Sequence, residues 1–148
     1  MYKVEKTLKL VLYCTLATVC EDGSPWGTPV FFVADEDMNI YWWSDEQAQH
    51  SRNIAKNPKV FITVFDSSLP ESQAKGVYIS ALAEAVSRDD LPRIIDLYNS
   101  KAKDFELTTK NTTGNAPTRL YKAKLAKKWT NSSGRREGMY IDVREELV

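Results

Sequence analysis

The chain has 148 residues, a length that fits one domain. Twenty Lys and Arg residues balance twenty Asp and Glu residues, so no net charge attracts polyanions, and we expect no binding to nucleic acid or to a membrane surface. Hydrophobic residues make up 43% and aromatic residues 11% of the chain, enough for a folded core. The four Trp residues suit a planar ligand, a subunit interface or a large core.

The first twenty residues have neither a membrane-crossing nor a secretory pattern. Lys3, Glu5, Lys6 and Lys9 interrupt the start, and the uncharged run 10–20 is shorter than the about 20 apolar residues that cross a bilayer. A signal peptide would need a basic start, an apolar centre and a cleavage site of small residues. We therefore expect a cytoplasmic protein.

The possible metal ligands also have simpler interpretations. If residues 11–20 form one strand, Cys14 and Cys20 lie roughly 20 Å apart at about 3.3 Å per residue, too far for a disulfide. Two Cys and one His fall short of a zinc set, and the acidic run 35–37 is typical of a tight turn. We expect core thiols and no metal.

The first half of the chain predicts one helix and three strands. The spacing of Val4, Leu8 and Val11 indicates a short helix over 2–9. β-Branched and aromatic residues predict strands over 11–20, 26–34 and 39–44, the first two joined by a turn at 21–25. Pro25 and Pro29 favour an edge strand or a backbone that faces a ligand.

The second half alternates helices and strands. Ser44 or Asp45 can cap a helix over 45–57 that Pro58 ends, and strands are predicted over 60–65 and 76–86. A second helix follows Asp89 and Asp90, with an apolar stripe made of Leu91, Ile94, Ile95 and Tyr98. The last predicted strands cover 120–129, with a bulge near Lys127, and 138–143. Six or seven short strands favour an antiparallel barrel or sandwich with added helices.

Familiar catalytic motifs are missing from the sequence. It has no Gly-rich phosphate loop and no GxSxG, HExxH or CxxC motif, and one His does not support a hydrolase triad. We assign no catalytic residue.

Residues 28–58 contain the most informative pattern, in which two strands lead to His50, Ser51 and Arg52 at a helix start. Helix-start amides with these side chains suit a phosphate, and Trp42 or Trp43 can line a pocket for a flat ring. On an ideal helix, however, His50 and Arg52 point about 200° apart. They converge only if the helix begins near Ser51; otherwise the segment is a solvent-facing helix.

The same stretch resembles a known family. Its parts are the run Thr28-Pro29-Val30-Phe31-Phe32, the acidic turn 35–37, the aromatic strand that ends at Ser44, and the basic segment that closes on Asn57-Pro58. With LATVCEDGSPWGTPV before and GVYISALAEAV after, this order resembles the FMN-binding split-barrel family, the pyridoxamine 5′-phosphate oxidase-like proteins, over residues 10–88.

The resemblance implies a single domain over 1–148 that is mainly β with added helices, a six-stranded antiparallel split barrel. It also implies a homodimer with FMN in two clefts between the subunits. Thr28, Pro29, Val30 and Phe31 would lie along the flavin, Trp43 and Ser44 beside its ring and ribityl chain, and Trp129 over it. His50 takes the place of a phosphate-binding Lys, with Ser51 and Arg52 adjacent, whereas Ala48-Gln49 replaces the family's Ser-Arg and weakens the clamp.

The implied function is a flavin-dependent oxidoreductase that acts on a small organic molecule, because the flavin itself carries the electron chemistry. Pyridoxamine phosphate oxidase activity is not expected, because the oxidases have a basic C-terminal segment where this chain reads VREELV. Three alternatives stay open: a deazaflavin (F420) reductase that uses Lys122 and Lys124, a haem protein with His50 as axial ligand, and a flavin-binding module without turnover.

Overall fold

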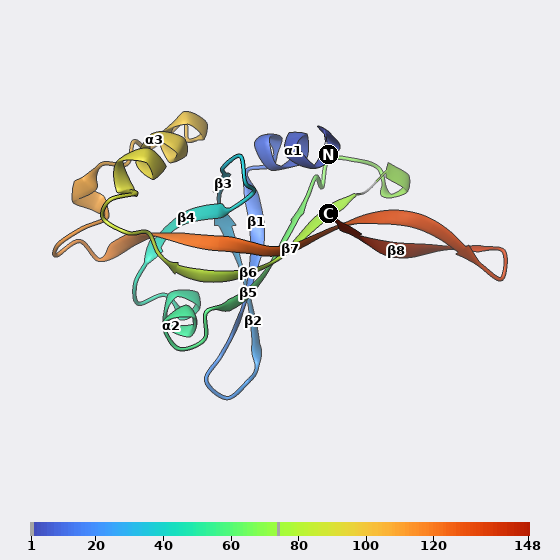
Figure 1. Ribbon diagram of the computed structural model, residues 1–148, viewed down its shortest axis with the longest axis horizontal. Helices are drawn as coiled ribbons and strands as arrows, with labels where there is room; N and C mark the ends of the chain where they lie inside the picture. Colours follow the sequence, from blue (N-terminus) through green and yellow to red (C-terminus); the bar gives the residue numbers. More distant parts are fainter. Residues whose placement is uncertain (1, 74) are drawn as a thin grey trace.

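The computed structural model describes residues 2–73 and 75–148, which form one antiparallel sheet with helices around it (Figure 1). The helices are α1 (Tyr2–Leu10), α2 (Gln49–Lys56) and α3 (Leu91–Lys101), with 3-10 turns η1 (Glu71–Gln73) and η2 (Thr109–Asn111). The strands are β1 (Tyr13–Val19), β2 (Pro25–Phe31), β3 (Val33–Ala34), β4 (Ile40–Asp45), β5 (Lys59–Phe65), β6 (Gly76–Ala85), β7 (Thr118–Arg136) and β8 (Met139–Leu147). No helix in this part of the chain combines the length and apolar character that a bilayer crossing requires.

The sheet curls into a barrel with one open seam. Its strand order is β2-β1-β5-β6-β7-β4-β3, and β8 pairs with β7 outside this path. Strands β2 and β4 contact each other, although no ladder of hydrogen bonds joins them in the described residues. Six strands therefore surround the core, which confirms the predicted split barrel, while β3 and β8 are additions to it.

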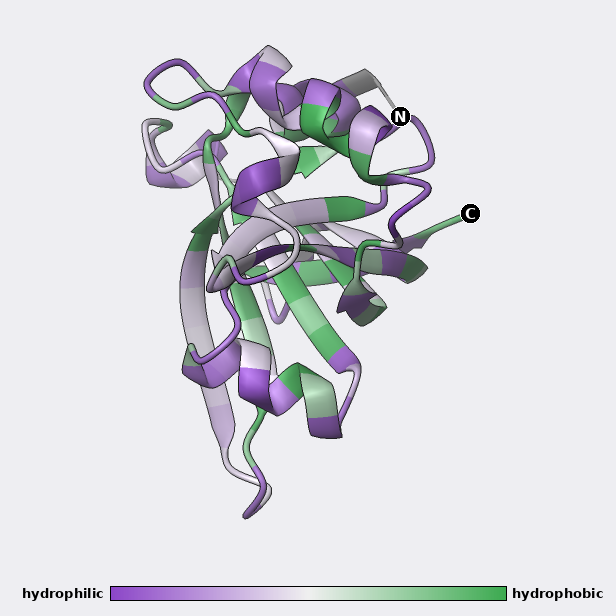
Figure 2. Ribbon diagram, turned by 90° about the vertical axis from the view of Figure 1, so that its left-hand side faces the viewer, coloured by the Kyte–Doolittle hydropathy of each residue, from purple (hydrophilic) through white to green (hydrophobic). Residues whose placement is uncertain are grey.

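The barrel interior is filled by every second residue of the strands. On β1, Cys14, Leu16 and Thr18 are buried while Tyr13 and Thr15 are exposed, as the period of two predicts. Both cysteines are free, as expected, and burial raises the pKa of the Cys14 thiol to about 12. Figure 2 shows hydrophobic stretches along several strands, whereas much of the hydrophilic colour lies on the helices and loops around the sheet.

A second core lies outside the barrel, where α3 covers β3 and β4. The predicted stripe of α3 is buried there, which confirms it, and Tyr41 of β4 packs against it with no exposed surface. The hydroxyl of Tyr41 donates to Asp35 Oδ2 at 2.8 Å, and burial raises its pKa to about 12.

Lys101, at the end of α3, ties this outer layer to the barrel. Its Nζ donates to three backbone oxygens, those of Leu8 (3.1 Å), Val11 (2.6 Å) and Phe32 (2.9 Å). Burial lowers the pKa of Lys101 to about 8, so the side chain is still protonated at neutral pH. One ammonium group thus holds α1, α3 and the junction of β2 and β3 together.

Two predicted boundaries in the first half of the chain are wrong. The helix expected over 45–57 begins at Gln49, and neither Ser44 nor Asp45 caps it: its N-cap is Ala48. Asp45 instead ends β4, and its carboxylate accepts from the backbone N–H of Gln47, which stabilises a turn before the helix. The strand expected over 26–34 is divided after Phe31, because the chain changes from pairing with β1 to pairing with β4.

The end of the chain differs most from expectation. The strand predicted over 120–129 runs on to Arg136, and the last strand runs over Met139–Leu147 instead of 138–143. Glu137 (φ 50°) and Gly138 (φ 82°) form the two-residue turn between them. The expected bulge is confirmed, because Ser80 and Ala81 of β6 face Lys127 and Leu125 and leave one extra residue on β7.

Candidate functional site

The two segments with the strongest family resemblance lie on either side of the seam. Residues 28–31 form the second half of β2, and Trp43 and Ser44 lie near the end of β4. In the described chain β2 has one ladder, with β1, so its other edge carries backbone groups without a strand partner. Pro29 therefore sits in an edge strand, as predicted, and the free edge can hydrogen bond a flat polar ring.

The residues of β2 divide between the two sides of the sheet. Val30 is buried in the barrel core and Thr28 is half-buried beside Leu16. Pro29 is exposed on the outside, and so is one side of Phe31, whose ring packs edge-on against Tyr98 at 5.2 Å. A ligand along β2 from outside therefore meets Pro29 and Phe31, not Val30.

His50 is turned inward. It is 7% exposed, and its Nε2 lies 2.8 Å from Ser44 Oγ, so the imidazole binds the end of β4. Burial lowers the pKa of His50, which keeps the ring neutral at neutral pH. In this arrangement the side chain adds no positive charge for a phosphate.

Ser51 and Arg52 follow His50 in the helix, and their side chains point to different environments. Ser51 is buried, and its hydroxyl donates to the backbone oxygen of Asp45 at 2.6 Å. Arg52 is exposed, and its guanidinium donates to Gln49 Oε1 at 2.7 Å on the helix surface. His50 and Arg52 thus point apart, and Arg52 is the member of this trio that presents a charge to solvent.

Trp42 and Trp43 are consecutive residues of β4, so their side chains point to opposite sides of the sheet. Trp42 is completely buried in the barrel and stacks on Tyr121 at 5.8 Å, so it is a core residue. Trp43 lies outside, stacked on Phe105 at 5.1 Å, and its Nε1 donates to the backbone oxygen of Asn111 at 3.4 Å. Trp43 is the one that borders the seam, half-covered by the segment after α3.

Trp129 lies far from the seam, on β7. It belongs to a row of directly paired residues that crosses the outside of the sheet: Pro29, Thr15, Thr63, Tyr78 and Trp129. Four strand spacings of about 4.8 Å separate the ends of this row. Within one chain Trp129 therefore cannot cover a ligand held between residues 28–31 and Ser44.

Apart from Trp129, the row belongs to a larger surface whose own side chains carry no charge, here called the uncharged face, although the Arg144 guanidinium from β8 lies 3.9 Å from the ring centroid of its member Tyr78. Its members point outward from four adjacent strands: Gly27, Pro29 and Phe31; Tyr13, Thr15 and Ala17; Phe61, Thr63 and Phe65; Tyr78 and Ser80. A cavity of about 520 Å³ opens on it, lined among others by Tyr13, Thr15, Pro29, Thr63 and Phe65, with the carboxylate residue Asp66 at its border. Sequence reasoning missed this surface, although its signal is visible as strands that lack charge on both faces, YCTLATV and FITVF.

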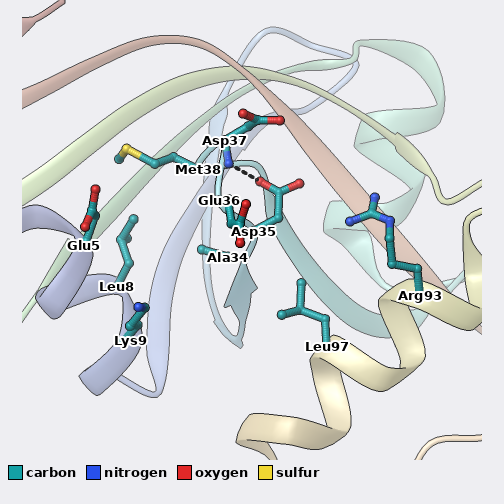
Figure 3. Close-up of a pocket in the computed structure, with 10 residues that line it drawn as sticks. All are labelled: Glu5, Leu8, Lys9, Ala34, Asp35, Glu36, Asp37, Met38, Arg93 and Leu97. Atoms are coloured by element: carbon teal, nitrogen blue, oxygen red, sulfur yellow. Dashed lines mark hydrogen bonds between the residues drawn. The ribbon is translucent and has the colours of Figure 1, made fainter.

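A second cavity, of about 680 Å³, lies between α1, α3 and the turn 35–38 (Figure 3). Glu36 and Asp37 border it on one side and Arg93 on another, above an apolar floor that includes Leu8 and Leu97. Asp35 accepts five hydrogen bonds: one from the backbone N–H of Asp37, three from the backbone N–H and side-chain amide of Asn39, and one from the hydroxyl of Tyr41, as expected of a tight turn. Among the described residues, no group of three or more His, Cys, Asp or Glu side chains is arranged to hold a metal ion.

Comparison with solved structures supports the fold. The chain is similar to a general stress protein 26 from Bacillus anthracis (14% identity, 96% of this chain and 97% of that one, TM-score 0.63). It is also similar to HutZ, the haem storage protein from Vibrio cholerae (20%, 84% and 89%, 0.66), and to an F420 reductase (23%, 84% and 94%, 0.61). At these identities the likeness is one of fold. No curated protein matches the sequence.

A family model adds a match at the level of sequence. The model described as pyridoxamine 5′-phosphate oxidase covers residues 3–130, which is most of the chain and includes α1 and all six barrel strands. This range is wider than the resemblance seen in the sequence, and it ends where β7 leaves the barrel. The chain belongs to the pyridoxamine 5′-phosphate oxidase-like family of split-barrel proteins.

Proposed function

We propose that this protein is a cytoplasmic FMN-binding flavoprotein that acts as a homodimer and oxidises or reduces a small organic molecule. Two observations carry the proposal: the unpaired edge of β2, and the cavity over β1 and β5 that Pro29 of β2 also lines. Family membership supports the proposal, because the sequence resemblance to this family implies an FMN site.

The cavity suits the flavin ring in size and chemistry. Its volume of about 520 Å³ lies within the usual range of small-molecule sites, roughly 300–1,000 Å³. Tyr13, Phe65 and Pro29 offer apolar contact, while Thr15 and Thr63 bring hydroxyl groups. Backbone groups of β2 would bond the polar edge of the ring. The residues present therefore fit a planar heteroaromatic group.

The residues at the start of α2 fit the phosphate group of FMN less well than the cavity fits the flavin ring. Arg52 supplies a positive charge, and the first turn of α2 supplies backbone amides, which both favour an anion. His50 and Ser51 use their polar atoms within the protein. We therefore assign the phosphate contact to Arg52 and the start of α2, and give His50 and Ser51 the role of holding α2 in place.

A second copy would complete the site. The uncharged face spans four strands and includes Tyr13 and Phe65, which are 59% and 51% exposed. Such a surface is typical of a subunit interface, and a twofold dimer presents the same patch from both copies. Pairing over this face would bring Trp129 of one copy towards β2 of the other, as the sequence resemblance implies.

The chemistry needs few protein groups. A bound flavin supplies electron and hydride transfer. The chain's own residues would orient the ring against β2, hold the phosphate and exclude water with the aromatic side chains of the uncharged face. Because the flavin would supply the reactive group, the protein would need no acid–base triad, and the sequence shows no motif of one.

The structure argues against haem more strongly than against deazaflavin F420. Haem would need an axial ligand, and the single His of the sequence is buried and bonded to Ser44, which argues against it. Deazaflavin F420 would use Lys122 and Lys124, of which Lys124 is exposed and Lys122 lies over the ring of Tyr41 at 5.8 Å. F420 is therefore the stronger alternative.

The visible spectrum of the purified protein tests the proposal, before and after addition of FMN and removal of the excess. A flavin band at about one FMN per chain supports it, and reduction of that band by NADH or NADPH distinguishes an enzyme from a binding module. A protein that ignores FMN but retains F420 would replace FMN by the deazaflavin. A haem band would contradict the role given to His50.

A further inference from the structure

The inference concerns Arg144 of β8, whose positive charge lies over the uncharged face. Arg144 pairs with Asn131 of β7, two residues along that strand from Trp129, so its side chain emerges on the same side of the sheet as Trp129. From there it crosses β7, and its guanidinium carbon lies 3.9 Å from the ring centroid of Tyr78 and 6.0 Å from that of Phe61. A cation from β8 thus rests on two members of a surface whose own side chains carry no charge.

The two carboxylates beside Arg144 on its own strand do not pair with it. Asp142 and Glu146 lie on the same side of β8, two residues away in either direction. Glu146 pairs instead with Lys127 at 3.3 Å, and neither Asp142 nor Arg144 takes part in an ion pair within the described chain. The exposed guanidinium of Arg144 therefore stacks on aromatic rings without a carboxylate at its side.

A carboxylate in the same situation borders the cavity on the uncharged face. Asp66 directly follows β5, and its Oδ1 accepts from the backbone N–H and the hydroxyl of Ser68 at 3.0 and 2.6 Å. These hydrogen bonds lower the pKa of Asp66, which is therefore ionised at neutral pH. Lys75 lies across the β5–β6 hairpin from Asp66, yet among the described residues no cation forms an ion pair with this carboxylate.

The proposed dimer brings these two charges to the same place. It puts Trp129 of one copy against β2 of the other, so its twofold axis must exchange the two ends of the row that runs from Pro29 to Trp129. Thr63 is the middle residue of that row, and the axis therefore passes close to it, along β5. Tyr78 of one copy then faces Thr15 of the other.

The guanidinium over Tyr78 consequently faces the cavity of the second copy, which Thr15 lines. The two charges also match along the strand direction, because one level across the sheet holds four neighbouring residues: Phe65, Gly76, Asn131 and Arg144. Asp66 comes directly after Phe65. A guanidinium that dimerisation removes from water needs a carboxylate to offset the loss of hydration, and Asp66 of the second copy is in position to supply it.

We propose that Arg144 of each copy forms an ion pair with Asp66 of the other copy across the dimer interface. Twofold symmetry makes this pair occur twice, once at each cavity. The proposal rests on the homodimer of the proposed function and identifies two residues that fix how the copies are aligned. Each pair would close one cavity at the border that Asp66 forms.

A double-mutant cycle on the full chain, read by sedimentation equilibrium, tests the proposal. Arg144→Gln removes one charge, and Asp66→Asn removes the other while its amide oxygen can still accept from Ser68. Each is expected to raise the dissociation constant of the dimer about tenfold, and the double variant no further, because either substitution alone already breaks the pair. Arg135→Gln is the matched control, since Arg135 lies on the same side of the hairpin but bonds the hydroxyl of Tyr140 at 2.9 Å, and it should leave the constant within twofold.

The outcomes separate the ion pair from the homodimer. A dimer that both single variants leave unchanged, or whose losses add in the double variant, overturns the ion pair and leaves the homodimer intact. Equal weakening by Arg135→Gln overturns it too, because the effect would then follow net charge. If Arg144→Gln loses its effect in the background of Asp142→Asn instead of Asp66→Asn, the guanidinium pairs with Asp142 and the proposal is wrong. A wild-type chain that stays monomeric at high concentration overturns the ion pair and the homodimer together.

Discussion

His50 Nε2 lies 2.8 Å from Ser44 Oγ, and this hydrogen bond joins the first turn of α2 to the end of β4. One residue later, Ser51 bonds the backbone of Asp45, so consecutive side chains attach the same two elements to each other. The segment to which the sequence resemblance gives an expected role in phosphate binding therefore joins the two elements beside the seam. Arg52 is left to face solvent.

The buried imidazole predicts a pH-dependent component of stability. Burial lowers the pKa of His50 below its ordinary value of 6.5, so below about pH 6.5 the unfolded chain binds more protons at this residue than the folded chain. The free energy of unfolding should then fall as the pH falls, and His50→Gln should remove that component. Urea unfolding of both proteins at pH 7.5 and 5.0 measures it. The same pH dependence in both would contradict the prediction.

Arg52→Ala should weaken FMN binding about tenfold, or about 1.4 kcal/mol, because it removes the exposed charge at the start of α2. Binding of riboflavin, which lacks the phosphate, should not change. Lys56→Ala is the matched control on the same helix, because Lys56 pairs with Glu21 at 2.8 Å. Quenching of flavin fluorescence measures both affinities. If the substitution weakens the binding of FMN and of riboflavin equally, Arg52 does not contact the phosphate.

The double variant His50→Ala/Arg52→Ala distinguishes the effect of the Arg52 charge from the effect of the hydrogen bond by which His50 holds α2. It should also weaken FMN at least tenfold, but here riboflavin binding should fall as well, because the loss of the bond to Ser44 loosens α2. Riboflavin binding equal to that of the wild type would mean that the imidazole does not position the seam.

The barrel could be predicted from the sequence because its strands obey local rules. Cys14, Leu16 and Thr18 alternate with outward residues, and the stripe from Leu91 to Tyr98 has the helical period. The start of α2 could not be predicted, because an Asp at position 45 is equally suited to cap a helix and to stabilise a turn. In the structure Asp45 stabilises a turn by accepting from the backbone N–H of Gln47, and the helix begins at Gln49.

The hairpin of β7 and β8 beyond the barrel and the uncharged face could not be predicted from the sequence, for different reasons. The stretch from Asn131 to Arg136 has neither apolar alternation nor strong β-formers, so its strand depends on pairing with β8. The uncharged face depends on the register of four strands, and a fifth strand places Trp129 in one row with Pro29 although one hundred positions separate them in the sequence. Residue types alone do not give that register.

Lys101→Met should lower the free energy of unfolding by about 3 kcal/mol, because the buried backbone oxygens of Leu8, Val11 and Phe32 would lose a charged donor. Lys103→Met, two residues further on and exposed, is the control and should change stability little. Chemical denaturation at pH 7 compares the two. An equal effect of both substitutions would mean that water replaces the ammonium without cost.

Thr63→Lys places a charge in the middle of the uncharged face, where Thr63 is paired with Thr15 on one side and Tyr78 on the other. In a twofold dimer over this face two ammonium groups would be buried in a cavity that Asp66 also lines, and one carboxylate per copy offsets only part of the desolvation cost, so the dissociation constant should rise about tenfold, or about 1.4 kcal/mol. Asn115→Lys, on an exposed loop, adds the same charge as a control. Sedimentation equilibrium and bound flavin are measured together, and both should fall in Thr63→Lys. A dimer of wild-type strength would place the interface elsewhere, whereas a monomer that retains FMN would mean that one chain forms the whole cleft.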